Sequence, residues 1–139
     1  MANIIVLDDS KELLQMIRTI FQLHNYEVRT ASTKPMLMAH LDIFKPDIIL
    51  MDVLLESSNG NEICKELKSN SETKNIPVIL FSGSHEQLRD YREYRADDII
   101  EKPFEFEDLE RKIKSLLAES RSVKSYVFIK NQHQSLEKE

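Results

Sequence analysis

The 139-residue sequence contains few of the residues on which many binding and catalytic motifs depend. Its single cysteine, Cys64, excludes an internal disulfide framework and a zinc site built from several cysteines. Its only two glycines, Gly60 and Gly83, lie too far apart for a P-loop or a glycine-rich dinucleotide fingerprint. The four histidines are scattered, so they form no helical metalloprotease motif. Any phosphate or metal chemistry must therefore depend on carboxylates, hydroxyl groups and lysine.

Long apolar runs and a basic charge balance are lacking as well. No apolar run exceeds four residues, and Met1–Ser10 has neither the basic start nor the apolar stretch of a signal peptide. The 24 acidic side chains outnumber the 19 basic ones, for a net charge of −5. This balance disfavours nucleic acid as a primary partner. We expect one globular domain in the cytoplasm, with no membrane partner.

Short apolar segments alternate along the chain with segments of helical periodicity. Strands are predicted at residues 3–7, 26–31, 47–51, 76–81 and 98–101. Helices are predicted after the caps Asp9 or Ser10 and Thr33, after Gly60, and over 85–95 and 105–119. Five such βα units predict an α/β fold, in which helices cover both faces of a parallel sheet. Cys64 falls on an apolar helix face, which favours core packing over reactivity.

Polar side chains follow four of the five predicted strands. Asp8 and Asp9 follow the first strand, Asp52 the third, Ser82 the fourth and Lys102 the fifth. In an open parallel sheet, ligands bind beyond the carboxyl ends of the strands, so these side chains are candidates for one site. Neighbouring carboxylates repel unless a cation such as Mg²⁺ offsets their charge, and a lysine suits a phosphate group. A carboxylate in such a site could attack phosphorus and form an aspartyl-phosphate.

Each of these residues also has an ordinary structural explanation. Asp8 and Asp9 could cap a helix, Asp52 could be a loop acid, and Ser82 could belong to a turn. Lys102 could be a solvated charge. Their convergence at one sheet edge favours a functional site.

The segments IVLDDS, PDIILMD, PVILFSGS and ADDIIEKPF occur in this order along the chain. Over residues 1–119 the sequence resembles the CheY-like receiver domain of bacterial response regulators, which act in two-component signalling. The resemblance implies a flavodoxin-like doubly wound fold of five βα units with strand order 2-1-3-4-5. It also implies a single-domain response regulator in which residues 120–139 form a C-terminal extension. The structure of that extension, including the cluster Tyr126–Ile129, is left open between a strand, a helical turn and a partner contact.

The resemblance assigns the phosphoacceptor and the metal ligands. Asp52 would accept the phosphoryl group and help to bind Mg²⁺. Asp9 would bind the ion directly, and Asp8 would help through water. The backbone carbonyl of Leu54 would be a further ligand, and its apolar side chain would shield the phosphoryl group from water.

The resemblance also assigns the residues around the phosphoryl group. Lys102 would pair with it, and the bond between Lys102 and Pro103 would be cis. Ser82 would be the switch hydroxyl that moves toward the phosphate, with the backbone N–H of Gly83 nearby.

Two positions depart from the family pattern. Ile99 stands where the family usually has Tyr or Phe, and it cannot reproduce the inward swing of an aromatic ring. Glu56 stands where a proline is usual, which predicts a different loop after Asp52. Neither change affects the phosphorylation chemistry itself.

Three functions are compatible with these residues. The first is a phosphoacceptor, not a conventional enzyme, that takes its phosphoryl group from a histidine kinase or a histidine phosphotransfer protein. It would signal to an unknown output protein through the face formed by residues 85–119. The second is a phosphorylation-independent adaptor, suggested by Ile99. The third is a Mg²⁺-dependent phosphatase of the haloacid dehalogenase type, which would need an aspartate in place of Ser10. Whether the chain forms a homodimer is left open.

Overall fold

The computed structural model describes residues 2–120. Five parallel strands form one sheet in the order β2-β1-β3-β4-β5, as the family resemblance implied. Their bounds are β1 Asn3–Leu7, β2 Glu27–Ala31, β3 Ile48–Asp52, β4 Val78–Ser82 and β5 Asp98–Glu101. The predicted strand ranges differ from these by at most two residues at either end, and the flavodoxin-like α/β fold is confirmed.

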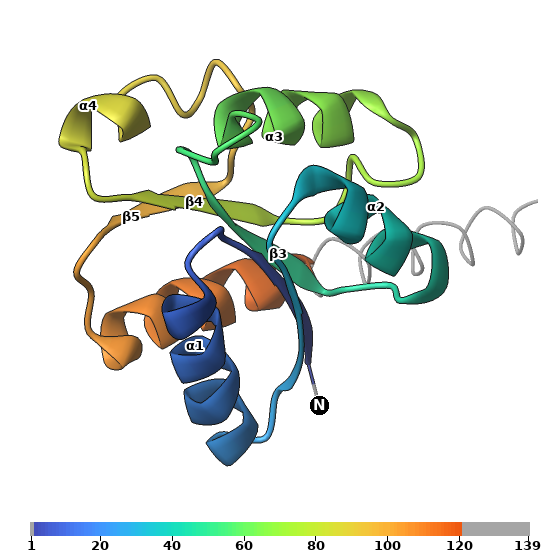
Figure 1. The fold of residues 1–139 in the computed structure, drawn as a ribbon. Coiled ribbons are helices and arrows are strands. Elements are labelled where there is room, and N and C mark those ends of the chain that lie inside the picture. The colour runs from blue at the N-terminus through green and yellow to red at the C-terminus, as the bar shows by residue number, and fades with distance from the viewer. Residues whose placement is uncertain (1, 121–139) are drawn as a thin grey trace, which may run out of the picture.

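Helices cover both faces of this sheet (Figure 1). Their bounds are α1 Lys11–Leu23, α2 Lys34–Ile43, α3 Gly60–Ser69 and α4 His85–Leu88, followed by a C-terminal helix over residues 106–120. The helix α1 and the C-terminal helix lie on one face, and α2, α3 and α4 lie on the other. The sheet is thus enclosed between two helical layers, as the apolar runs of its central strands require.

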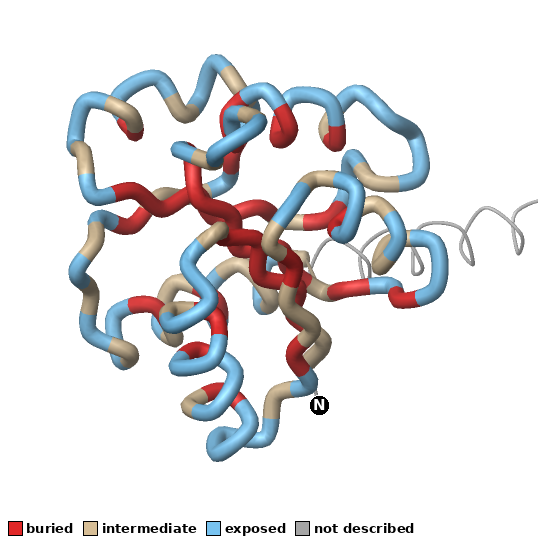
Figure 2. The backbone as a smooth tube through the Cα atoms, viewed as in Figure 1, coloured by how far each residue is buried: buried red, intermediate tan, exposed pale blue. Residues whose placement is uncertain are grey.

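Two apolar cores lie on opposite faces of the sheet. In β1, Ile5 and Leu7 belong to the core beneath α2 and α3, whereas Ile4 and Val6 belong to the core beneath α1 and the C-terminal helix. This division follows from the alternation of side chains along a strand. Figure 2 shows the buried strands running through the centre of the molecule between more exposed helices. These strands are packed on both faces, which positions the residues that follow their carboxyl ends.

Side chains cap the first two helices where the sequence predicted. Ser10 Oγ accepts a hydrogen bond from the Leu13 N–H at 3.3 Å, and Thr33 Oγ1 accepts one from the Met36 N–H at 3.3 Å. Each cap satisfies a backbone donor that the first helical turn leaves free. Since Ser10 is the cap of α1, the preceding Asp8 and Asp9 remain available at the end of β1.

Cys64 packs in the core on the α3 side of the sheet and is fully buried. Burial raises the pKa of its thiol to about 11, because the interior disfavours the thiolate. The prediction of core packing is confirmed.

The predicted helix over 85–95 is wrong for most of its length. Only His85–Leu88 is helical, and residues 89–95 form turns that end at Arg95 with a φ of 64°. No side chain caps the start of α4. Within residues 89–95, only Tyr91 and Tyr94 are half-buried, so this segment lacks the continuous apolar stripe that stabilises a longer helix.

The predicted extension beyond Ser120, with its cluster Tyr126–Ile129, lies outside the described residues. Within residues 2–120, no helix has the length and apolar character needed to cross a membrane.

Candidate functional site

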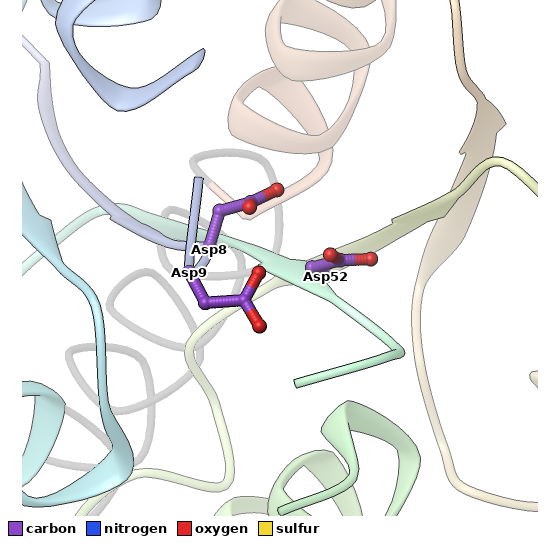
Figure 3. Close-up of side chains that lie close together, drawn as sticks. All are labelled: Asp8, Asp9 and Asp52. Carbon is purple, nitrogen blue, oxygen red and sulfur yellow. The ribbon is translucent and has the colours of Figure 1, made fainter. Parts of the chain in front are cut away.

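Three carboxylates meet at the carboxyl edge of the sheet. Asp8 and Asp9 follow β1, and Asp52 ends the neighbouring strand β3. One carboxylate oxygen from each residue lies within 4.8 Å of the others, and Figure 3 shows the three side chains gathered at the two strand ends. Their proximity follows from the pairing of β1 with β3 in parallel register, Leu7 opposite Met51.

Lys102 joins this cluster from the segment after β5. Its Nζ lies 2.7 Å from Asp8 Oδ2 and 3.4 Å from Asp52 Oδ2, and 4.8 Å from the centre of the Phe81 ring. Asp8 and Asp52 are both buried, and the single positive charge of Lys102 can offset only one of their two negative charges when both are ionised. The site therefore keeps a strong attraction for a further cation.

Burial raises the pKa of Asp52 from its ordinary value of 3.8 to about 6. The value of about 6 also includes an increase caused by the negative charge of Asp8 and decreases caused by Lys102 and the Leu54 N–H. A cation between the carboxylates would favour their charged forms. Three carboxylate oxygens form a donor set that fits a hard ion such as Mg²⁺.

Backbone N–H groups hold all three carboxylates in place. The Ser10 N–H donates to Asp8 Oδ1 at 2.8 Å, and the Leu54 N–H donates to Asp52 Oδ1 at 3.4 Å. The Glu56 N–H donates to Asp9 Oδ2 at 3.0 Å. This last contact leaves no signature in the sequence, because any residue other than proline carries such a donor.

Ser82 lies at the end of β4 and is almost fully buried. Its carbonyl oxygen accepts the Lys102 N–H at 2.9 Å, and its Oγ accepts the Ser84 N–H at 3.2 Å. The turn chemistry considered for Ser82 is therefore present, and the same residue links β4 to the chain segment that carries Lys102. Its role as a switch hydroxyl stays a prediction.

Leu54 lies beside the acidic cluster at the start of the β3–α3 loop. Its backbone pairs with Asn59 in an isolated antiparallel bridge, and its side chain is 52% exposed. The roles predicted for its carbonyl oxygen and side chain are not tested by these contacts and stay predictions.

Gly60 lies very close to the end of β3, a contact that the sequence did not predict. A Cβ at this position would lie 2.0 Å from the carbonyl oxygen of Asp52. The Gly60 N–H also donates to the Val53 carbonyl at 2.7 Å. Only glycine fits this packing, and the signal for it was that the chain has just two glycines.

Two other expectations concern β5 and the segment that follows it. The bond between Lys102 and Pro103 is cis, which is confirmed. Ile99 is half-buried on β5 and packs against the core on the α3 side. At this position, where the family resemblance led us to expect an aromatic ring, the side chain packed against the core is therefore aliphatic.

The family model described as the response regulator receiver domain matches residues 4–114. The chain belongs to this family. Receiver domains typically bind Mg²⁺, and the cluster of Asp8, Asp9 and Asp52 matches that property. Receiver domains of response regulators also interact with kinases and output domains.

Relatives in sequence include regulators from several bacteria. The receiver domain is 30% identical over 115 residues to the nisin biosynthesis regulatory protein NisR of Lactococcus lactis subsp. lactis, covering 81% of this chain and 49% of NisR. It is 31% identical over 117 residues to the phosphate regulon transcriptional regulatory protein PhoB of Pseudomonas aeruginosa, covering 83% of this chain and 51% of PhoB. The chain thus spans about half the length of the curated relatives it matches.

Solved structures show the same fold. Chemotaxis protein CheY4 of Vibrio cholerae superposes with a TM-score of 0.76 at 27% identity, covering 84% of this chain and 98% of CheY4. NtrX of Brucella abortus superposes with a TM-score of 0.84 at 25% identity, covering 92% of this chain and 29% of NtrX. The receiver fold therefore occurs both as almost a whole chain and as part of a larger protein.

Some expectations are not tested by these likenesses. PhoB is named a transcriptional regulatory protein, and this chain matches only half of it, so the expectation of no nucleic-acid partner stays a prediction. The cytoplasmic location and the division into residues 1–119 and 120–139 also stay predictions.

Proposed function

We propose that this receiver domain is a phosphoacceptor in two-component signalling, with Asp52 as the residue that is phosphorylated. The observation that supports this is the position of the Asp52 carboxylate, buried beside Asp8 and Asp9 and 3.4 Å from the Lys102 ammonium group. The phosphoryl donor would be a histidine kinase or a histidine phosphotransfer protein. The chain itself would catalyse only its own phosphorylation and dephosphorylation, not the turnover of a separate substrate.

In the transfer step, a carboxylate oxygen of Asp52 attacks the phosphorus atom. The new P–O bond forms as the P–N bond to the donor imidazole breaks, and the imidazole nitrogen keeps the electron pair. Asp52 must be ionised to attack, and a pKa of about 6 leaves it mainly ionised at neutral pH. Lys102 then lies close enough to offset negative charge on the transferred group.

The carboxylates of Asp8, Asp9 and Asp52 and the carbonyl oxygen of Leu54 would hold Mg²⁺ in this domain. The bound ion would supply positive charge for the phosphoryl oxygens and relieve the repulsion among the three carboxylates. The hydroxyl of Ser82, at the end of the neighbouring strand β4, would donate a hydrogen bond to a phosphoryl oxygen. The signal would then pass to an output protein by contact.

The proposal is tested by intact mass spectrometry after incubation with acetyl phosphate, with and without Mg²⁺. We expect one phosphoryl adduct on the wild type in the presence of Mg²⁺ and none on Asp52→Ala. Asp90→Ala is the matched control, because Asp90 is an exposed aspartate, and it should be modified like the wild type. An adduct of equal yield on Asp52→Ala would contradict the assignment.

Ile99 favours one alternative, an adaptor that binds its partner without phosphorylation. Its aliphatic side chain, packed against the core, lacks the ring that family members use to respond to the phosphate. Equal partner affinity of the wild type and Asp52→Ala would support the adaptor. The phosphatase alternative has no such support, since Ser10 occupies the place of its second aspartate and serves as the cap of α1.

A further inference from the structure

The loop between β3 and α3 reaches back across the sheet edge to the end of β1. At its base, Leu54 pairs with Asn59, and the Gly60 N–H donates to the Val53 carbonyl. Between these contacts, the Glu56 N–H donates to Asp9 Oδ2 at 3.0 Å. The loop is thus closed at its base and attached near its middle to one member of the acidic cluster.

The three carboxylates differ in how they are held. Asp8 accepts hydrogen bonds from the Ser10 N–H and from Lys102, and Asp52 is contacted by the Leu54 N–H and by Lys102. Among residues 2–120, the Glu56 N–H is the only donor of a hydrogen bond to the Asp9 carboxylate. The orientation of Asp9, which is less buried than Asp8 and Asp52, therefore depends on this one contact.

We propose that the backbone N–H of Glu56 is a positioning group for Asp9. It holds one oxygen of the Asp9 carboxylate and thereby directs the other toward the space shared with Asp8 and Asp52, where a divalent cation would bind. This inference rests on the proposed function, because it concerns the metal site of the same acidic cluster. It also revises the expectation that a residue other than proline at position 56 leaves the chemistry of the site unaffected, because proline would lack this N–H.

The physical reason lies in the strength and geometry of the contact. A hydrogen bond from a neutral N–H to a carboxylate is stronger than one between neutral groups. Groups that orient metal ligands from outside the coordination shell typically change metal affinity by about ten- to a hundredfold when they are removed. The contact uses the backbone of Glu56 and not its exposed carboxylate. Substitutions that keep the N–H should therefore keep its effect.

Two substitutions at position 56 separate the N–H from the side chain. Glu56→Ala removes the carboxylate and keeps the N–H, whereas Glu56→Pro removes both. We expect Glu56→Pro to bind Mg²⁺ alone about tenfold more weakly than Glu56→Ala, measured by calorimetric titration of the full chain. Equal dissociation constants for the two variants would overturn the inference and leave the proposed function intact. A wild type that binds no Mg²⁺ would overturn both.

A second measurement needs neither proline nor a metal ion. Amide hydrogen exchange in the metal-free wild type should show protection of the Glu56 N–H, although the residue is exposed. Asp9→Ala removes the acceptor and should accelerate this exchange about tenfold or more. The Gly60 N–H, bonded to Val53, is the internal control and should not change. Unchanged exchange at Glu56 in Asp9→Ala would overturn the inference even if Glu56→Pro failed to fold.

Discussion

Asp52 carries its negative charge in surroundings that disfavour it. Burial and the neighbouring Asp8 raise its pKa from 3.8 to about 6, although Lys102 lies 3.4 Å away. A group whose pKa is raised by folding holds its proton to higher pH in the folded state than in the unfolded chain. Its contribution to stability is therefore complete below about pH 3.8 and is lost as the pH rises through about 6. At neutral pH the charge on Asp52 is a net cost to the metal-free fold.

Asp52→Asn should consequently stabilise the metal-free domain at neutral pH. We expect a gain of about 1 to 3 kcal/mol in the free energy of unfolding at pH 7.5, shrinking toward pH 4, where the wild-type carboxyl is protonated. Lys102 keeps a partner in this variant, because it lies 2.7 Å from Asp8. Urea unfolding between pH 4 and 8 in the presence of a chelator measures the difference. A gain that does not vary with pH would contradict the argument.

The side chain of Leu54 is expected to slow dephosphorylation of Asp52. Its half-exposed apolar side chain lies at the rim of the site, where we expect it to exclude water from the acyl phosphate. Leu54→Asn should therefore dephosphorylate several-fold faster than the wild type, measured by loss of the mass adduct over time. Ser57→Asn places the same side chain elsewhere on the loop and should leave the rate unchanged. An unaltered rate in Leu54→Asn would remove the shielding role.

At the scale of elements, the packing of α3 against β3 requires a residue without a side chain at position 60. The first residue of α3, Gly60, lies so close to β3 that a Cβ would be 2.0 Å from the Asp52 carbonyl oxygen. Gly60→Ala should lower the free energy of unfolding by about 2 kcal/mol or more, because the backbone of either element must shift. Gly83→Ala is the matched control, since its Cβ would meet nothing within 4 Å. Equal thermal stability of the two variants would contradict this packing.

The predicted elements show where sequence patterns suffice. The strand β1 could be predicted with its observed bounds because Ile4–Leu7 are all fully buried, which requires a continuous apolar run. The end of helix α4 could not be predicted from the sequence, because its few apolar residues fit a helix of eleven residues as well as the single turn that forms. Its length is decided by which of Leu88, Tyr91 and Tyr94 can reach the core while the chain turns into β5.

At the scale of the whole molecule, the described core residues run from Ile4 to Ile113 on both faces of the sheet. A chain truncated after Ser120 keeps all of them. We therefore expect it to unfold in one cooperative transition, with a free energy of unfolding within about 1 kcal/mol of the full chain. Urea unfolding of both proteins measures this. A larger loss would show that residues 121–139 contribute to the stability of the receiver domain and that the predicted boundary is wrong.

The sequence alone determined the class of fold and which residues could share a site. Alternating apolar and amphipathic segments require a parallel sheet covered on both faces, and such a sheet brings the residues after its strands to one edge. Asp8, Asp9, Asp52 and Lys102 could therefore be named before their distances were known.

Only the tertiary structure decided how those residues are held. The bond from the Glu56 N–H to Asp9, the approach of Gly60 to Asp52 and the raised pKa of Asp52 each depend on distances that exist only in the folded chain. Backbone donors and carbonyl oxygens are the same in nearly every residue, so no sequence pattern records where they meet. Burial, too, becomes a property of a carboxylate only when both layers of helices have closed over the sheet.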